Sequence, residues 1–334
     1  MTVTPQTNTT LREIAGLISG RDNFVLCGHV SPDGDCLGSQ LALWRALRAL
    51  GKKATCVLVK DDPVPAAVTF LPGIDKMVPA GRFEGTAETF IGLDVPTRER
   101  IGESACAILD SCSCSITIDH HAVPERMCDF AYVDPESAST SILVWELVKL
   151  ICDEPPTESA LCAYTGLVTD TGGFRYQNSD AAAFAAASEF VGLGIDPSFV
   201  AAKVFQCRSW ASLKLESLIL GRMVTNAEKT WVLSWVSESD MLNLSARKDD
   251  TEELIDSLRS LVGIRVACML RDQDGAVRGS LRAKDDTDVA SLARKLGGGG
   301  HRAAAGFTLE CGLERAVELL KKELEALVGV ATGE

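Results

Sequence analysis

The sequence lacks any apolar run approaching the ~20 residues that a membrane-spanning helix needs. Its first residues, MTVTPQTNTTLREI, are polar and show neither the basic segment nor the apolar core of a signal peptide. We therefore expect a cytoplasmic protein that does not associate with membranes. Proline is sparse, with 12 residues in 334, and 46% hydrophobic and 24% charged residues are typical of a soluble globular protein. The length predicts two domains.

Positive charge is also scarce, because 33 Lys and Arg residues stand against 46 Asp and Glu residues and leave a net charge of −13. Proteins that clamp long nucleic acids without sequence preference use a broad basic surface to displace counterions. The composition argues against that class of protein. It favours a small or short substrate that is held in one local pocket.

Paired CxxC spacing, which marks many structural zinc sites, is absent among the 12 cysteines. Most of them stand singly in apolar segments, where cysteine behaves as a small hydrophobic residue. Cys112 and Cys114 are one residue apart, a spacing that does not favour a metal site. We expect reduced thiols throughout.

Short strand-like runs alternate with helical stretches over residues 1–195, which predicts an α/β domain with a largely parallel sheet. The expected strands are NFVLCGH, KATCVLV, TFIGLD and SITIDHH, and the expected crossover helices are LGSQLALWRALRAL and SASTSILVWELVKL. Residues 196–222 are predicted to form a helical linker. Residues 223–334 are predicted to form a smaller α+β domain with a hairpin at QDG. We expect the active site in the cleft between the domains.

Histidine is rare as well, with four residues in the chain, and His29 opens the segment HVSPDGDCLGS directly after a predicted strand. Asp33 and Asp35 follow four and six positions later. Hard divalent cations prefer carboxylate oxygens, and imidazole adds a ligand that suits manganese. In open α/β sheets, ligands bind beyond the carboxyl ends of the strands. A metal cradle therefore competes here with the simpler alternative of an Asp-Gly turn that caps a helix.

The same pattern recurs at three further apolar runs, which we interpret as strands. TFIGLD ends in Asp94, SITIDHH ends in Asp119, His120 and His121, and GLVTDTGGF places Asp170 after an apolar run. Each acid alone is explained by a turn or a cap. Together they supply enough ligands for two cations ~3.5–4 Å apart that share a carboxylate, as in two-metal hydrolases. Such a site makes hydroxide from water and needs no nucleophilic side chain.

In the predicted smaller domain, strand alternation in AVRGSLRAK puts Ser280 and Arg282 on one face and Leu281 on the other. An exposed edge strand with a solvated arginine is the alternative. GGGGHRAAAGF follows, with four glycines whose bare amides can approach an anion, and then His301 and Arg302. This run does not match the common glycine-rich phosphate motifs, and a flexible hinge is its alternative. We expect the two segments to hold a substrate phosphate.

The chain resembles the DHH phosphoesterase superfamily, and specifically its members with a DHH-associated C-terminal domain. The motifs HVSPDGDCLGS, GLDVPTRERIG, ITIDHH, YVDPESASTS, GLVTDTGGFRY and GGGGHRAAAGF occur in the family's order and span nearly the whole chain. Within the superfamily, the short two-domain form looks like the bacterial nanoRNase and pAp phosphatase group.

The resemblance implies a specific role for each motif residue. Two manganese ions, for which Mg²⁺ or Co²⁺ can substitute, would be held by His29 and Asp33 at one ion, Asp35, His120 and Asp170 at the other, and Asp94 between them. Asp119 would orient the ligands, and His121 would face the scissile phosphate or the leaving group. The nucleotide would be received by Ser280, Arg282, Gly298, Gly299, Gly300 and His301.

The resemblance also implies an activity. It is the hydrolysis of oligoribonucleotides of about two to five residues to nucleoside 5′-monophosphates, together with dephosphorylation of 3′-phosphoadenosine 5′-phosphate (pAp) to AMP. RecJ-type single-strand exonucleases, cyclic-dinucleotide phosphodiesterases and manganese pyrophosphatases share the metal motifs but differ in their other domains. A catalytically silent nucleotide-binding module is the alternative from another class. The direction of degradation, the preference for RNA over DNA, and the choice between monomer and homodimer stay open.

Overall fold

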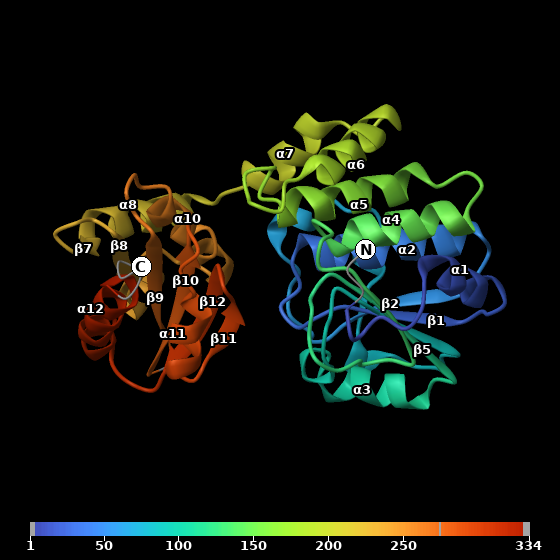
Figure 1. The fold of residues 1–334 in the computed structure, drawn as a ribbon, viewed down its shortest axis with the longest axis horizontal. Coiled ribbons are helices and arrows are strands. Elements are labelled where there is room, and N and C mark those ends of the chain that lie inside the picture. Colours follow the sequence, from blue (N-terminus) through green and yellow to red (C-terminus); the bar gives the residue numbers. More distant parts are fainter. Residues whose placement is uncertain (1–3, 274, 330–334) are drawn as a thin grey trace. The chain divides into compact units, whose positions relative to one another are not determined.

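The computed structural model describes residues 4–273 and 275–329, and the backbone alone of His301. The chain divides into two compact units, residues 1–207 and residues 208–334, so the boundary falls inside the segment expected as a linker. Figure 1 shows the elements of both units. In the described ranges, no helix combines the length and the apolar character needed to cross a membrane.

Unit 1 is built on a six-stranded sheet in the order β3-β2-β1-β4-β5-β6, and every strand pair in it is parallel. The strands are β1 Phe24–Cys27, β2 Ala54–Leu58, β3 Val78–Pro79, β4 Thr89–Leu93, β5 Cys114–Asp119 and β6 Phe130–Val133. Parallel sheets are covered on both faces, which explains why the central strands are continuous apolar runs. The chain reverses its direction of growth between β1 and β4. Such a switch point opens a crevice at the carboxyl ends of the two strands.

Helices cover both faces of this sheet, with α2, α4 and α5 layered over one face and α3 on the other (Figure 1). The helices are α1 Leu11–Ser19, α2 Gly34–Ala49, α3 Gly102–Ser111, α4 Thr140–Ile151, α5 Thr157–Asp170, α6 Ala181–Gly192 and α7 Pro197–Phe205. Short 3₁₀ helices are η1 Ala66–Val68, η2 Ile74–Lys76, η3 Ala80–Arg82 and η4 Arg98–Arg100. At Gly38, α2 meets α5 so closely that a Cβ atom would lie 2.6 Å from the carbonyl oxygen of Cys162. At Gly34, in the first turn of α2, a Cβ atom would lie 2.4 Å from the side chain of Thr169, so this turn lies against the end of α5.

The interpretation of the run before Asp170 as a strand was wrong. Asp170 is the last residue of helix α5, in which nine of 14 residues are buried. A helix that is buried on most of its surface shows no clear apolar stripe, so its sequence looks like a buried strand. Strands β3 and β6 were not predicted, and β3, with two residues, is too short to give a period.

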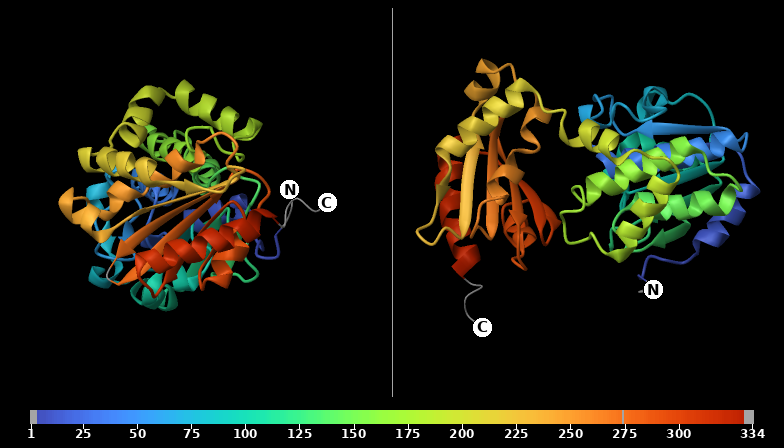
Figure 2. Two further views of the ribbon diagram at one scale, coloured as in Figure 1. Left: turned by 90° about the vertical axis from the view of Figure 1, so that its left-hand side faces the viewer. Right: turned by 90° about the horizontal axis from the view of Figure 1, so that it is seen from above.

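Unit 2 contains a mixed sheet in the order β11-β12-β10-β9-β8-β7, in which only the β8–β9 pair is parallel among the described pairs. Its elements are α8 Trp210–Arg222, β7 Val224–Thr225, β8 Trp231–Val236, α9 Glu238–Asn243, η5 Lys248–Thr251, α10 Leu254–Arg259, β9 Val266–Gln273, β10 Ala276–Ala283, α11 Val289–Lys295, β11 Gly299–His301, β12 Ala304–Leu309 and α12 Leu313–Gly329. Helices α11 and α12 pack on one face and α8 and α10 on the other (Figure 2). The predicted α/β fold with a smaller α+β domain is confirmed.

One expectation and one alternative for unit 2 were wrong. The glycine run was expected as a loop, but Gly299–His301 forms strand β11, which pairs antiparallel with β12. Its glycines permit close approach, because a Cβ atom on Gly298 would lie 2.1 Å from the carbonyl oxygen of Gly306. The edge-strand alternative for β10 fails too, since β9 and β12 flank it. The expected β9–β10 hairpin is present, and residue 274 in its turn lies outside the described residues.

Candidate metal centre

The candidate site of unit 1 lies at the carboxyl ends of β1, β4 and β5. His29 follows β1, Asp94 follows β4, and Asp119 ends β5. Because parallel strands end at the same edge of the sheet, their side chains converge at the switch point between β1 and β4. Asp94 has a φ of 56°, a left-handed conformation that non-glycine residues adopt at some cost and that is found often at functional sites.

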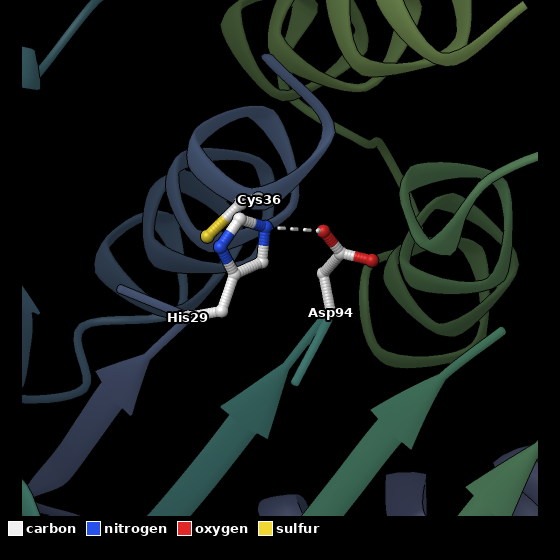
Figure 3. A group of neighbouring side chains, drawn as sticks. All are labelled: His29, Cys36 and Asp94. Atoms are coloured by element: carbon white, nitrogen blue, oxygen red, sulfur yellow. Dashed lines mark ion pairs between the residues drawn. The ribbon is translucent and has the colours of Figure 1, made fainter. Parts of the chain in front are cut away.

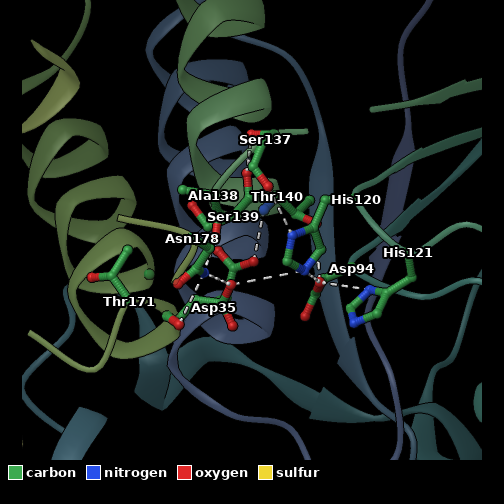
Figure 4. Close-up of polar contacts among 12 residues, drawn as sticks. Asp35, Asp94, His120, His121, Ser137, Ala138, Ser139, Thr140, Thr171 and Asn178 are labelled. Atoms are coloured by element: carbon green, nitrogen blue, oxygen red, sulfur yellow. Dashed lines mark hydrogen bonds and ion pairs between the residues drawn. The ribbon is translucent and has the colours of Figure 1, made fainter. Parts of the chain in front are cut away.

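Asp94 lies at the centre of the cluster and is 2% exposed. Its Oδ2 is 3.4 Å from Nε2 of His29, and its Oδ1 is 3.6 Å from Nε2 of His120 (Figures 3 and 4). Oδ1 also lies 3.5 Å from Nδ1 of His121 and accepts a hydrogen bond of 3.0 Å from the hydroxyl of Thr140. One carboxylate therefore presents its two oxygens to two imidazoles from different elements.

Backbone carbonyls fix the tautomers of two of these histidines. Nδ1 of His29 is 2.9 Å from the carbonyl oxygen of Val30, and Nδ1 of His120 is 3.2 Å from that of Ser137. A nitrogen that faces a carbonyl must carry the proton, so Nε2 of each neutral ring keeps a lone pair. Both lone pairs are directed toward the carboxylate of Asp94, which is the arrangement of metal-binding imidazoles.

Asp33 serves two purposes with its two oxygens. Its Oδ1 accepts backbone hydrogen bonds from Asp35 at 3.1 Å and Cys36 at 3.0 Å, and so caps helix α2. Its Oδ2 lies 3.8 Å from Nε2 of His29, and the side chain is 61% exposed. The helix cap that the sequence offered as one alternative is present, and the second oxygen stays directed toward His29.

The buried carboxylate of Asp35 is held by the first turn of helix α4. It accepts hydrogen bonds from the backbone N–H groups of Thr140 at 2.7 Å (Figure 4) and of Ser141 at 2.9 Å. Free amides at a helix N-terminus favour a negative charge. The sequence did not predict this contact, although the segment YVDPESASTS carries the serines and threonine that begin α4.

Asp170 completes a second group of potential ligands. Ligand atoms of Asp35, His120 and Asp170 all lie within 4.8 Å of one another. Oδ2 of Asp170 is 3.9 Å from Nε2 of His120 and accepts a hydrogen bond of 3.3 Å from the amide of Asn178. Asp170 therefore reaches the ends of the strands from the last residue of a helix, and not from a strand as the sequence pattern indicated.

Asp119 is fully buried and organises the two histidines that follow it. Its Oδ1 accepts the backbone N–H groups of His120 at 2.7 Å and His121 at 3.0 Å, and lies 2.8 Å from Nδ1 of His121. These bonds turn the chain after β5 and orient the ring of His121. Nε2 of His121 faces away from Asp119.

The electrostatics of the cluster suit bound cations. Burial, and then the charge of Asp94, raise the pKa of Asp35 to about 7. Burial and the neighbouring carboxylates also raise the pKa of Asp170. Burial acts to raise the pKa of Asp94 as well, but in the metal-free protein a hydrogen bond from the protonated His29 ring and the charges of the histidines outweigh it and lower the pKa below the usual range. Crowded oxygen and imidazole donors whose charges repel one another are the donor set that binds divalent cations. The residues fit such ions.

Two family models match the sequence of this chain. The sequence model of the DHH family, N-terminal domain, matches residues 23–167, and that of the DHHA1 domain matches residues 230–329. The chain is 31% identical to the bifunctional oligoribonuclease and PAP phosphatase NrnA of Thermus thermophilus, over 89% of this chain and 88% of the relative. The chain belongs to the DHH family. Its relatives are phosphoesterases, and the chain is a metal-dependent hydrolase.

Solved structures share the fold of this DHH protein. An exopolyphosphatase-related protein from Bacteroides fragilis is 28% identical and superposes with a TM-score of 0.89 over 95% of both chains. RecJ from Thermus thermophilus in complex with Mn²⁺ is 15% identical and has a TM-score of 0.59, over 95% of this chain and 54% of RecJ. At that identity, the second likeness concerns the fold alone.

Cys36 lies beside the DHH site, and the sequence pattern did not indicate it as a potential ligand. Its sulfur lies within 4.8 Å of ligand atoms of His29 and Asp94. Figure 3 shows the sulfur beside the His29 ring, on the side away from the Asp94 carboxylate. Burial raises the pKa of this thiol well above its usual value, so it stays protonated and uncharged. The hard oxygen and imidazole groups are therefore the better ligand set.

In the DHHA1 domain, Ser280 and Arg282 share one face of β10, while Leu281 is fully buried on the other. Ser280 pairs with Gly306 of β12, and Arg282 pairs with Ala304. These small partners leave room above both side chains. Gly300 adopts a φ of 138°, a conformation that glycine tolerates best.

Proposed function

We propose that this chain is a manganese-dependent phosphoesterase that hydrolyses short oligoribonucleotides to nucleoside 5′-monophosphates and converts pAp to AMP. The observation that carries the proposal is Asp94, whose two oxygens face the Nε2 atoms of His29 and His120. This arrangement supports a carboxylate shared by two cations. The relative from Thermus thermophilus that is named an oligoribonuclease and PAP phosphatase supports the choice of substrate.

Six side chains would hold the two cations. His29 and Asp33 would bind one cation, Asp35, His120 and Asp170 the other, and Asp94 both. Divalent cations in such a site supply hydroxide near neutral pH and neutralise charge on the phosphoryl oxygens. Manganese suits a mixed set of imidazole and carboxylate ligands, and the RecJ structure solved with Mn²⁺ shows that ion in a protein of the same fold.

The remaining motif residues would orient the substrate and the ligands. Asp119 holds Nδ1 of His121, so Nε2 of that ring would act on a phosphate oxygen or on the leaving group. In unit 2, Ser280, Arg282 and the backbone amides of 298–301 would bind a nucleotide phosphate, because arginine and bare amides are the usual partners of phosphate.

The test is an assay of the purified protein, stripped of metal and then supplied with Mn²⁺. Its substrates are pAp and a trinucleotide labelled at the 5′ end or at the 3′ end. We expect turnover of both substrates, and the two labels give the direction of degradation. Turnover of neither would refute the proposal. A cyclic dinucleotide serves as a further substrate, and binding without hydrolysis under varied metals would support a silent nucleotide-binding module instead.

Asp94→Asn is the decisive variant, with Asp153→Asn as its matched control. Asp153 is an exposed acid in the loop between α4 and α5, so its variant makes the same change of charge away from the site. Asp94→Asn should lower kcat by more than the about 10- to 100-fold that changes around a metal ligand usually cause. Asp153→Asn should retain wild-type kcat.

A further inference from the structure

Arginine side chains extend the row of Ser280 and Arg282 along the same face of unit 2. Successive side chains of a strand alternate between faces, so Arg278 lies on the face of Ser280 and Arg282, opposite the buried Val277 and Leu281. Arg278 is exposed, and Ser280 and Arg282 are half-buried. On this face, helix α8 packs against β8, and α10 contacts β8, β9 and β10. The exposure of Arg278 leaves this end of the row accessible to a ligand.

Arg271 adds a second positive charge at one end of this row. It lies on β9 directly opposite Arg278 in the antiparallel pair. Like charges in this position repel and destabilise a sheet. Burial, and then the charge of Arg278, lower the pKa of Arg271, while the charge of Glu252 acts in the other direction. The charge of Glu252 acts on both arginines and balances this repulsion in part.

The described residues do not fully satisfy either guanidinium. Nη1 of Arg271 donates to the hydroxyl of Thr251 at 2.9 Å, but its buried Nε has no hydrogen-bond partner among the described residues. Within residues 4–273 and 275–329, Arg278 makes no hydrogen bond and no ion pair. A buried donor without a partner costs free energy. An anion placed between the two arginines would satisfy both.

The spacing of the row suits a single-stranded nucleic acid. Two residues along an antiparallel strand span about 7 Å, so Ser280 lies about 7 Å and Arg278 about 14 Å from Arg282, measured along the backbone. Such steps are comparable to those between neighbouring phosphates of an extended strand. Grooves that bind single strands track the backbone with positive charge in this way.

We propose that Arg271 and Arg278 form a distal phosphate subsite, which binds a phosphate of an oligoribonucleotide beyond the one held by Ser280 and Arg282. The inference rests on the proposed function for the nature of the ligand. The subsite adds binding energy only for substrates long enough to reach it. It therefore favours oligoribonucleotides of several residues over dinucleotides and pAp.

Arg278→Gln tests the subsite, with Arg294→Gln as its matched control. Arg294 is an exposed arginine of α11, which packs on the opposite face of the sheet. For Arg278→Gln, kcat/KM on a pentaribonucleotide should fall about 10-fold relative to that on a dinucleotide, as expected for one charge-assisted contact. Arg278→Lys, which keeps the charge, should recover part of the loss. Arg294→Gln should leave the ratio of the two substrates unchanged.

Binding of a fluorescent pentaribonucleotide, followed by anisotropy, provides a readout that does not need hydrolysis. In Arg278→Gln, the slope of log K against log salt should become shallower by about 0.7, the value for one single-strand phosphate. Loss of the repulsion should leave the melting temperature equal to wild type or higher. An unchanged ratio and slope, or equal losses on both substrates, would overturn the subsite. Absence of hydrolysis by wild type would overturn only the proposed function, because the anisotropy comparison still tests the arginines.

Discussion

Thr140→Val isolates the contribution of one hydroxyl to the metal centre. Thr140 donates a hydrogen bond of 3.0 Å to Oδ1 of Asp94, and both side chains are almost completely buried. Valine has nearly the same shape, so the substitution removes the donor without opening a cavity. The backbone N–H of residue 140, which binds Asp35, remains. Any change in metal affinity then reports the orientation of the shared carboxylate.

The magnitude follows from the nature of the bond. A hydrogen bond to a charged group contributes about 1.5–3 kcal/mol, and each 1.4 kcal/mol is a factor of about 10 in affinity. Loss of a partner that orients a metal ligand typically lowers metal affinity 10- to 100-fold. The two estimates agree. We therefore expect the dissociation constant for Mn²⁺ to rise about 10- to 100-fold in Thr140→Val.

The assay is calorimetric titration of metal-free protein with Mn²⁺, accompanied by urea unfolding. Thr165→Val is the matched control, because Thr165 is equally buried and donates at 2.8 Å to the carbonyl oxygen of Leu161 within α5. It should lose about 0.5–1.5 kcal/mol of stability and no metal affinity. Thr140→Ser restores the hydroxyl and should restore most of the affinity. If Thr140→Val and Thr165→Val bind Mn²⁺ equally well, Thr140 does not position Asp94.

Three further outcomes are expected. Asp33→Asn keeps a good helix cap, but it replaces the oxygen near His29 with an uncharged group. The affinity for Mn²⁺ should therefore fall while thermal stability changes little. A large loss of stability would contradict separate roles for the two oxygens of Asp33. Gly300→Ala places a Cβ atom 2.6 Å from the carbonyl oxygen of Ala304 at a φ of 138°, so KM should rise with Mn²⁺ affinity unchanged. In the metal-free protein, the Asp35 pKa of about 7 lies above the unfolded value of 3.8, so the folded state binds more protons between these values and stability falls as pH rises. The raised histidine pKa values act in the same direction, so the melting temperature should drop from pH 5 to pH 8, less steeply in Asp35→Asn; a rise would contradict the shift.

Much of the candidate site could be predicted because its residues follow strands. His29, Asp94 and Asp119 each come directly after or at the end of an apolar run, and parallel strands end at a common edge. Thr140 could not be predicted in this way. Its role depends on helix α4 starting at that edge, and a threonine after a serine in the sequence indicates only a helix beginning.

The fold was harder to predict where burial removes the pattern. Helix α5 has buried residues on most of its surface, so its run looks like a strand and Asp170 was given the wrong element. The prediction for the glycine run of unit 2 was wrong for a different reason. Glycine is rare in strands because it has no side chain to pack, yet Gly298 and Gly300 are needed where β11 and its flank approach β12.

A helix cap and a metal ligand do not have to be alternatives for an acid such as Asp33 at the start of α2. A carboxylate has two oxygens with about four acceptor positions, so one oxygen can bind backbone amides while the other remains directed at a ligand. Asp33 caps α2 with Oδ1 and faces His29 with Oδ2. The amides hold the carboxylate through Oδ1 and so fix the direction of Oδ2, which would pre-order the candidate metal centre. A turn or cap pattern in the sequence is therefore no evidence against a metal ligand at the same residue.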